Sequence, residues 1–207
     1  MISSFGWSAL ALLFGYLVLF FWGSAIAARA AGKPVWLFGR AKGRDRWAAI
    51  GFRAAFVLAS LAPFLWLAMP VLRGIDPFWD RGSTAALGVI GVFVAGIGAM
   101  LAFAAQMSMG SSWRVGVAEG ATGNLVSDGL YRLSRNPTFV GQFMLLAGVG
   151  FAIPAIPTIF APLIFFWSAS IQARSEEAAL RQALGPDYDR YAATVPRWIG
   201  LRQRMNP

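Results

Sequence analysis

The chain has 207 residues, 57% of them hydrophobic and only 13% charged, with 18 Lys and Arg against 9 Asp and Glu. Soluble domains carry about 25% charged residues, so this composition excludes an ordinary soluble domain and predicts a single all-α integral membrane domain over residues 1–207. Cys and His are both absent, which excludes disulfides, thiolate metal sites and imidazole bases. We therefore expect no bound metal.

The net charge of +9 does not indicate a nucleic-acid partner, because the basic residues lie in short loops and form no aromatic-interleaved face. Of the 18 Lys and Arg, six lie in residues 29–46, three in 108–137 and six from Arg174 onward. Basic residues mark the cytosolic side of a membrane protein. This distribution predicts an N-terminus outside and a C-terminus in the cytosol.

Three apolar segments in residues 1–107 are long enough to cross a bilayer, which takes about 20 residues. They cover residues 5–28, 47–72 and 84–107. Pro63 predicts a kink in the second segment. Arg53 lies near the basic end of the same segment, where a long side chain reaches the interface; a buried substrate contact is the alternative for this residue.

The third segment is rich in glycine. Its Gly-Ile-Gly sequence resembles part of a dinucleotide-binding loop, but no strand precedes it. Small residues in an apolar helix instead favour close helix–helix packing, and we assign that role to Gly88, Gly91, Gly96 and Gly98.

Residues 108–207 are predicted to contain a cofactor-binding loop, a helical hairpin and a cytosolic tail. A folded polar loop covers residues 108–137, and residues 138–171 are nearly uncharged. One straight helix of that length overshoots the membrane at 1.5 Å per residue, so we place a turn at the Ile-Pro-Ala-Ile-Pro sequence, residues 153–157. The result is about five transmembrane helices, the last two a hairpin, followed by short cytosolic C-terminal helices.

Arg135-Asn136-Pro137 begins the first helix of this hairpin. Pro suits a first helical position and Asn suits an N-cap, so the sequence has a purely structural interpretation as a capped helix start. The same geometry also provides free N–H groups beside arginine, which bind a carboxylate. Both interpretations remain open from the pattern alone.

A second polar cluster follows the hairpin. Glu176 or Glu177 can hold an ammonium or a ribose hydroxyl, and Tyr188 and Tyr191, three residues apart, can cover an aromatic ring. With the helix start, these groups suit a zwitterionic cofactor that carries adenosine. The structural alternatives are a solvated helix face for the glutamates and an interfacial aromatic belt for the tyrosines.

The C-terminal half contains a spaced series of motifs: Trp113-Arg114, Leu125-Val126, Gly129-Leu-Tyr131-Arg, Arg135-Asn-Pro137, Gly141, Glu176-Glu177, Gly185-Pro-Asp-Tyr188-Asp-Arg-Tyr191 and Val195-Pro-Arg-Trp198. This series, rather than any one motif, resembles the isoprenylcysteine carboxyl methyltransferase and phospholipid methyltransferase superfamily. It implies an integral-membrane enzyme that transfers a methyl group from S-adenosylmethionine to a lipid-borne or membrane-soluble carboxylate, thiol or amine.

The resemblance also implies site residues. The implied catalytic residues are Arg135, Asn136 and Glu177, and the implied cofactor-binding residues are Tyr131, Arg135, Asn136, Pro137, Gly141, Glu176, Glu177, Tyr188 and Tyr191. Asparagine stands where the family usually has histidine, and Phe139 where it usually has tyrosine. Asn136 can donate and accept hydrogen bonds but is no base. The Arg-Asn-Pro variant resembles a bacterial branch of the superfamily, which implies a location in a bacterial inner membrane, with the active site on the cytosolic side.

Two other functions are compatible with the sequence. One is a membrane reductase of sterol or isoprenoid double bonds that uses a nicotinamide cofactor, although no dense arginine cluster for its phosphates is present. The other is a non-catalytic membrane scaffold, which the missing histidine allows. The sequence does not specify the acceptor or the oligomeric state.

Overall fold

The computed structural model describes residues 2–32, 34–36, 43–79, 84–113, 115 and 125–200. Three basic residues of the first loop (Lys33, Arg40 and Lys42), Arg114 and residues 116–124 and 201–207 lie outside these ranges. The helices described are α1 (Ser4–Ala31), α2 (Gly43–Ala68), α3 (Pro70–Ile75), α4 (Ala85–Met109), α5 (Pro137–Ala152), α6 (Ile156–Leu184) and α7 (Pro186–Thr194), with the 3-10 turns η2 (Gly110–Ser112) and η3 (Gly129–Arg132).

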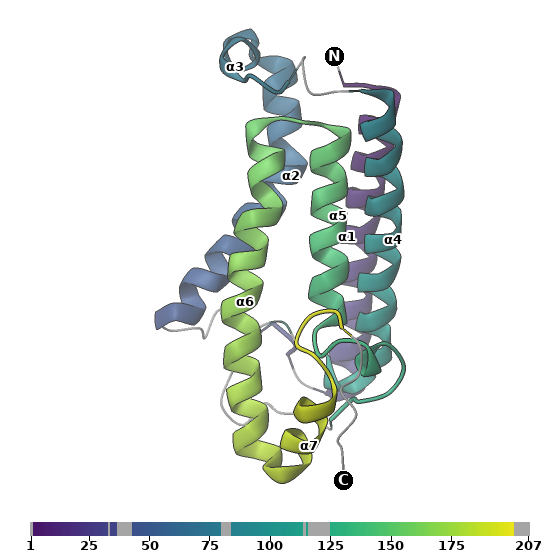
Figure 1. The fold of residues 1–207 in the computed structure, drawn as a ribbon, viewed down its shortest axis with the longest axis vertical. Helices are drawn as coiled ribbons and strands as arrows, with labels where there is room; N and C mark the ends of the chain where they lie inside the picture. The colour runs from purple at the N-terminus through teal and green to yellow at the C-terminus, as the bar shows by residue number, and fades with distance from the viewer. Residues whose placement is uncertain are drawn as a thin grey trace.

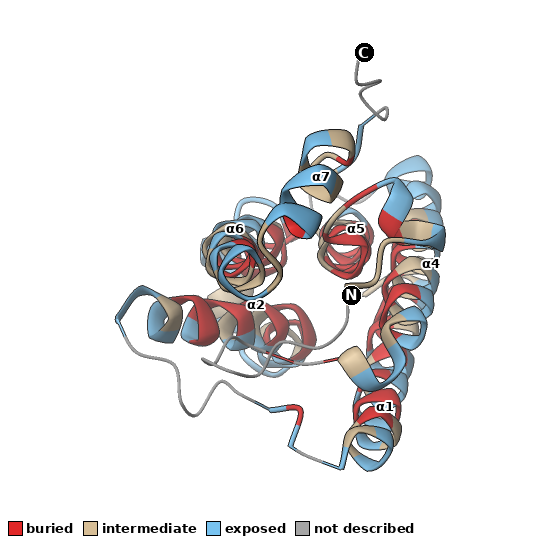
Figure 2. Ribbon diagram, turned by 90° about the horizontal axis from the view of Figure 1, so that it is seen from below, coloured by how far each residue is buried: buried red, intermediate tan, exposed pale blue. Residues whose placement is uncertain are grey.

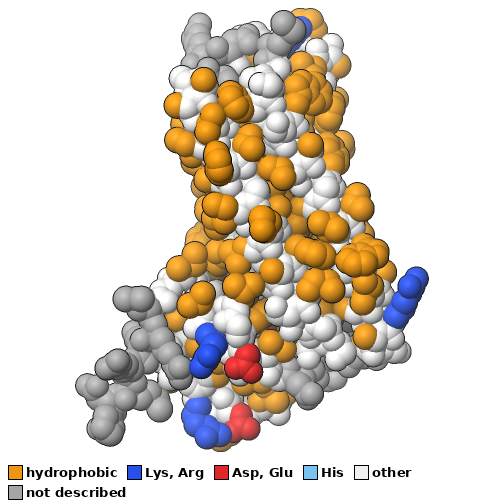
Figure 3. Space-filling model, turned by 90° about the vertical axis from the view of Figure 1, so that its right-hand side faces the viewer, with side chains coloured by type: hydrophobic (Ala, Val, Ile, Leu, Met, Phe, Trp, Pro, Cys, Tyr) orange, Lys and Arg blue, Asp and Glu red, His pale blue; other side chains and the backbone are white. Residues whose placement is uncertain are grey.

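Four of these helices, α1, α2, the α4–η2 segment and α6, are long and apolar enough to cross a membrane. The shorter apolar helix α5 has 16 residues, about 24 Å at 1.5 Å per residue, and lies among them (Figure 1). Hydrophobic side chains cover the middle of the face in Figure 3, and most of its charged side chains gather at the end that holds α7. The predicted all-α membrane fold is confirmed.

Helix α5 is the centre of the bundle. It packs against α4 on one side and α6 on the other, while α1 packs on α4 and α2 on α6. Viewed from the α7 end, its buried residues cover most of the helix (Figure 2). The buried faces of the other helices turn toward it. The Arg-Asn-Pro sequence, which leads into the first residue of α5, is therefore positioned by a helix that is packed on both sides.

The α4–α5 contact depends on glycine. A Cβ on Gly98 would lie 2.6 Å from the carbonyl oxygen of Gly141, and one on Gly141 would lie 2.6 Å from the carbonyl oxygen of Gly98. Gly91 and Gly148 repeat this relationship two turns away. The packing role predicted for Gly91 and Gly98 is confirmed. A Cβ on Gly88 would collide with Phe5 of α1, whereas a Cβ on Gly96 would have no neighbour closer than 3.8 Å.

Buried hydrogen bonds join α1 to the rest of the bundle. Gln106 of α4 donates to the Phe20 carbonyl at 2.9 Å and to Ser24 Oγ at 3.1 Å. The Trp113 indole also donates to Ser24 Oγ, at 3.0 Å. Polar side chains in an apolar interior must be paired, so these bonds specify how α1 sits against α4 and the turn that follows it.

At the end of the bundle opposite α7, Asp76 joins the α3 segment to the hairpin turn. Its carboxylate accepts from the Trp66 indole at 2.8 Å, from the Phe78 N–H at 2.9 Å and from the Ile156 N–H at 2.8 Å. The last bond satisfies a free N–H in the first turn of α6. The predicted turn between the two hairpin helices is confirmed, with α5 ending at Ala152 and α6 beginning at Ile156.

The predicted second span, residues 47–72, was wrong at its end. Helix α2 ends at Ala68 and α3 begins at Pro70, because a residue before proline is driven out of the helical region. Met69 has φ −115° and ψ 97°. Pro63, where the sequence predicts a kink, lies inside α2 without ending it.

Candidate functional site

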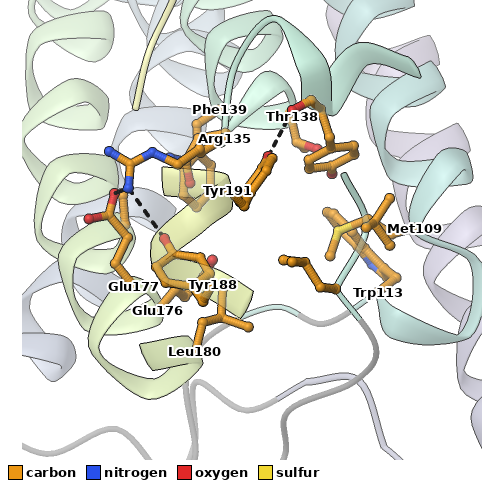
Figure 4. Close-up of a pocket in the computed structure, with 15 residues that line it drawn as sticks. Met109, Trp113, Arg135, Thr138, Phe139, Glu176, Glu177, Leu180, Tyr188 and Tyr191 are labelled. Carbon is orange, nitrogen blue, oxygen red and sulfur yellow. Dashed lines mark hydrogen bonds and ion pairs between the residues drawn. The ribbon is translucent and has the colours of Figure 1, made fainter. Parts of the chain in front are cut away.

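The candidate site lies at the α7 end of the bundle, where the start of α5, the last turns of α6 and helix α7 meet (Figure 4). A fourth element completes it: residues 195–200, called the C-terminal strap below. The start of α5 lies about 40 to 60 residues before the other three segments in the sequence, and the helical hairpin α5–α6 brings them together. The two polar clusters of the sequence therefore lie side by side in the fold.

Glu177 is the most heavily bonded side chain of the site. It is 4% exposed, and both carboxylate oxygens accept from the Arg197 guanidinium, Oε1 at 2.6 Å and Oε2 at 2.8 Å. Arg135 Nη1 lies 3.3 Å from Oε1 on the same carboxylate. The hydrogen bond to Glu177 raises the pKa of Arg197 above its usual value, since the guanidinium is stabilised in its charged form.

The C-terminal strap is bonded to the start of α5 through backbone groups. The Pro196 carbonyl accepts from the Arg135 N–H at 2.9 Å. The Arg197 carbonyl accepts from the Asn136 side-chain amide at 3.0 Å and from Ser134 Oγ at 3.3 Å. Asn136 occupies the N-cap position, as predicted, but its side chain makes no cap hydrogen bond. Its amide therefore holds the strap and leaves the first turn of α5 without a side-chain cap.

The tyrosines lie on the α7 side of the site. Tyr188 OH accepts from Arg135 Nη1 at 3.4 Å, and Tyr191 OH donates to the Tyr131 carbonyl at 2.8 Å. The Tyr188 and Tyr191 rings are T-shaped with centroids 6.1 Å apart. Burial raises the pKa of Tyr188, and the nearby Glu177 charge raises it further. Burial also raises the pKa of Tyr191, so both phenols stay neutral.

These groups enclose a small cavity of about 80 Å³, well below the roughly 300–1,000 Å³ of small-molecule sites. The wall combines apolar and polar side chains; those named in Figure 4 are Met109, Trp113, Arg135, Thr138, Phe139, Glu176, Glu177, Leu180, Tyr188 and Tyr191. Two buried polar atoms of the wall, Thr138 Oγ1 and Arg135 Nε, have no hydrogen-bond partner among the described residues. A ligand larger than the cavity requires some of these side chains to move.

Most of the sequence-predicted site residues line this cavity: Tyr131, Arg135, Asn136, Glu176, Glu177, Tyr188 and Tyr191. Pro137 is the first residue of α5 and is not part of the wall. Gly141 faces the backbone of α4 at Ala102 instead. Sequence reasoning did not assign a role to Arg197 or Ser134. The Val195-Pro-Arg-Trp198 motif contains Arg197, but only the fold shows that it reaches Glu177.

Comparison with known families agrees with this arrangement. Residues 87–187 match the family model described as phospholipid methyltransferase. Over this segment, just under half of the chain, the protein is similar to the phospholipid methyltransferase family. The matched segment begins in α4 and ends in α7, so it covers the hairpin and both glutamates, whereas α1, α2 and the C-terminal strap lie outside it.

The match supports a membrane methyltransferase in general terms. No curated protein and no solved structure matches the chain. Among the described residues no group of three or more His, Cys, Asp or Glu could hold a metal ion.

Proposed function

We propose that this protein transfers a methyl group from S-adenosylmethionine to a lipid-borne or membrane-soluble acceptor. The observation that carries the proposal is the position of Arg135 and Thr138 at the uncapped first turn of α5, inside the segment matched to a methyltransferase family. Arg135 Nε and Thr138 Oγ1 are buried there without partners among the described residues. Donors of this kind at a helix N-terminus suit a carboxylate.

The residues of the site fit a zwitterionic cofactor that carries adenosine. Arg135 and the first N–H groups of α5 would hold its carboxylate, while Glu176 and Glu177 would hold its ammonium or its ribose hydroxyls. The rings of Tyr188 and Tyr191 would pack on its base. When bound, the cofactor supplies an activated methyl group, so the protein mainly needs to hold the acceptor in line with it.

The ion pairs of Glu177 bear on the class of acceptor. A general base must be able to take up a proton, and a carboxylate held by two guanidiniums is a poor base. His is absent from the chain. The site therefore favours an acceptor that reacts without losing a proton, a carboxylate or a thiolate, over an amine.

The test is the binding of S-adenosylhomocysteine to the purified protein in nanodiscs by calorimetry, with NADPH measured in parallel. We expect saturable binding of the adenosyl ligand and none of NADPH. Thr138→Val should weaken binding about tenfold without lowering the melting temperature, because it removes a hydroxyl that has no partner in the described fold. Arg190→Ala, at an exposed ion pair with Asp187, is the matched control.

Absence of adenosyl binding in the wild-type protein would overturn the proposal, and binding of NADPH alone would favour the reductase. Unchanged affinity in Thr138→Val would show that the start of α5 does not bind the cofactor. The methyltransferase assignment would then be tested with Arg135→Gln, the second variant.

We also propose that the site end of the bundle faces the cytosol, with the N-terminus of α1 outside. Most of the basic residues that the structure describes lie toward that end, and basic residues remain on the cytosolic side of the membrane. A reporter that is active only in the cytosol should be active when fused to the C-terminus and inactive when fused to the N-terminus. A reporter that is active only outside should give the opposite result. The reverse pattern would contradict the orientation.

A further inference from the structure

A second, larger cavity lies between α1, α2 and α5. Its volume is about 450 Å³, inside the roughly 300–1,000 Å³ range of ligand sites. Most of its wall is apolar and aromatic, and four polar side chains are set into it: Tyr16, Arg53, Ser60 and Gln142. Polar groups are costly at membrane depth unless they have partners. Their presence around one apolar cavity indicates an occupant that is itself amphiphilic.

The hydrogen bonding of this wall is incomplete. Gln142 is 1% exposed, and its Nε2 donates to Tyr16 OH at 2.7 Å. Its Oε1 is buried and has no partner among the described residues. Because Tyr16 OH accepts from Gln142, its own proton is available to an acceptor such as an ester carbonyl. Ser60 is already satisfied by the Phe56 carbonyl at 2.7 Å.

Arg53 gives the cavity a cationic end. It lies ten residues after Gly43, about 15 Å along α2, and lines the cavity with Trp36. Trp is enriched at the level of lipid head groups, and basic pockets between transmembrane helices bind anionic lipid heads. We therefore place the head group of an occupant beside Arg53 and Trp36, and its apolar part against the aromatic rings of the cavity wall.

The cavity is separate from the methyl-transfer site. Phe139 lines the small cavity, and Phe52 and Phe56 line the large one. Phe165 packs between them, with ring centroids 6.3 Å from Phe139, 5.4 Å from Phe52 and 5.9 Å from Phe56. These rings form an aromatic partition. An occupant of the large cavity does not reach the start of α5 unless the partition opens.

We propose that this cavity holds the head-group and ester region of one anionic glycerophospholipid as a resident lipid, with its phosphate at Arg53 and an ester carbonyl at Tyr16 OH. The acyl chains are too large for a cavity of about 450 Å³ and extend from it into the bilayer. The site is built from α1, α2 and α5, and the two former helices lie outside the segment matched to the family. The proposal is independent of the methyl-transfer function, because it concerns binding only and uses none of the cofactor residues.

Native mass spectrometry of the detergent-purified protein tests this, with dioleoylphosphatidylglycerol as the probe and dioleoylphosphatidylcholine as the zwitterionic comparison. We expect one tightly retained phosphatidylglycerol and about tenfold weaker retention of phosphatidylcholine. Arg53→Gln should remove this preference. Arg44→Gln, which removes an exposed charge from the same end of α2, should keep it.

Tyr16→Phe, which keeps the ring, should weaken retention of both lipids equally, since both carry ester carbonyls. Equal retention of the two lipids by the wild-type protein, or an unchanged preference in Arg53→Gln, would overturn the proposal. If Arg53→Gln fails to fold, Val57→Trp, which fills the cavity from α2, takes its place and should abolish retention. Methylation of the retained lipid would contradict the separation of the two sites. Binding of S-adenosylhomocysteine, measured on the same samples, reports the proposed function separately.

Discussion

Arg197 and Glu177 are joined by two parallel hydrogen bonds, Nε to Oε1 at 2.6 Å and Nη2 to Oε2 at 2.8 Å. A guanidinium and a carboxylate in this geometry form one of the strongest polar contacts available to a protein. The pair links the C-terminal strap to α6, and the Arg197 carbonyl links the strap to α5 through Asn136. The strap is thereby bonded to both α5 and α6.

We expect Arg197→Ala to lower the free energy of unfolding by about 1–3 kcal/mol, the usual effect of losing a hydrogen bond to a charged group. Arg197→Lys should recover only part of the loss, because an ammonium does not bond both oxygens in parallel. Thermal unfolding in detergent measures both. Arg181→Ala, at a pair more than half exposed, is the control. Equal melting temperatures for wild type and Arg197→Ala would show that the strap is not held by this contact.

The glycine contact between α4 and α5 can be tested by comparing two Gly→Ala variants on the same helix. Gly98→Ala places a methyl group against backbone atoms of α5, and rigid backbone cannot yield as a side chain does. We expect a loss of about 1–3 kcal/mol or more. Gly96→Ala, two residues away on the same helix, has no neighbour within 3.8 Å of the new methyl and should change stability by less than about 1 kcal/mol, in the favourable direction. The two variants unfolding alike would contradict the structure.

Asp76 is expected to be important for the opposite end of the bundle. Asp76→Ala leaves the Trp66 indole and the N–H groups of Phe78 and Ile156 without their acceptor, and we expect a loss of about 2–5 kcal/mol. Denaturation followed by tryptophan fluorescence measures it. Asp187→Ala, at an exposed ion pair, should cost at most about 1 kcal/mol. A similarly small loss in Asp76→Ala would remove Asp76 as the link between α3 and α6.

The raised pKa of Tyr188 predicts a dependence on alkaline pH. Burial and then the Glu177 charge place it above the unfolded value of about 10. A group whose folded pKa is raised contributes stability that is fully present below the unfolded pKa and lost as pH rises through the folded one. The melting temperature should therefore fall above about pH 10, less steeply in Tyr188→Phe. Parallel curves for the two proteins would contradict this.

Much of the fold follows from the sequence because the membrane simplifies the problem. Long apolar runs have few alternatives to helix, and the proline-containing turn at residues 153–155 and the Gly185-Pro186 helix end are local signals. The break at Met69–Pro70 is also local, but the apolar residues around it obscured it.

The site was only partly predictable. Its residues could be named from the order of the motifs, but their contacts could not. Asn136 bonds a carbonyl 61 residues away, and Glu177 bonds an arginine 20 residues away. Such partners depend on how the hairpin folds back, which no periodicity in the sequence records. Gly141 could not be assigned correctly from the sequence either. Binding a cofactor and packing against α4 both require a small residue, so the glycine alone does not distinguish the two roles.

The backbone contact of α4 with α5 has one further consequence. Two helices that touch through Gly91, Gly98, Gly141 and Gly148 leave no seam for a lipid tail or a water file, and they cannot slide without collision. The α4–α5 pair is therefore the rigid part of the bundle. Movement that admits the proposed cofactor or acceptor must come from the elements around it, namely α1 and α2 on the membrane side and the strap with α7 at the end.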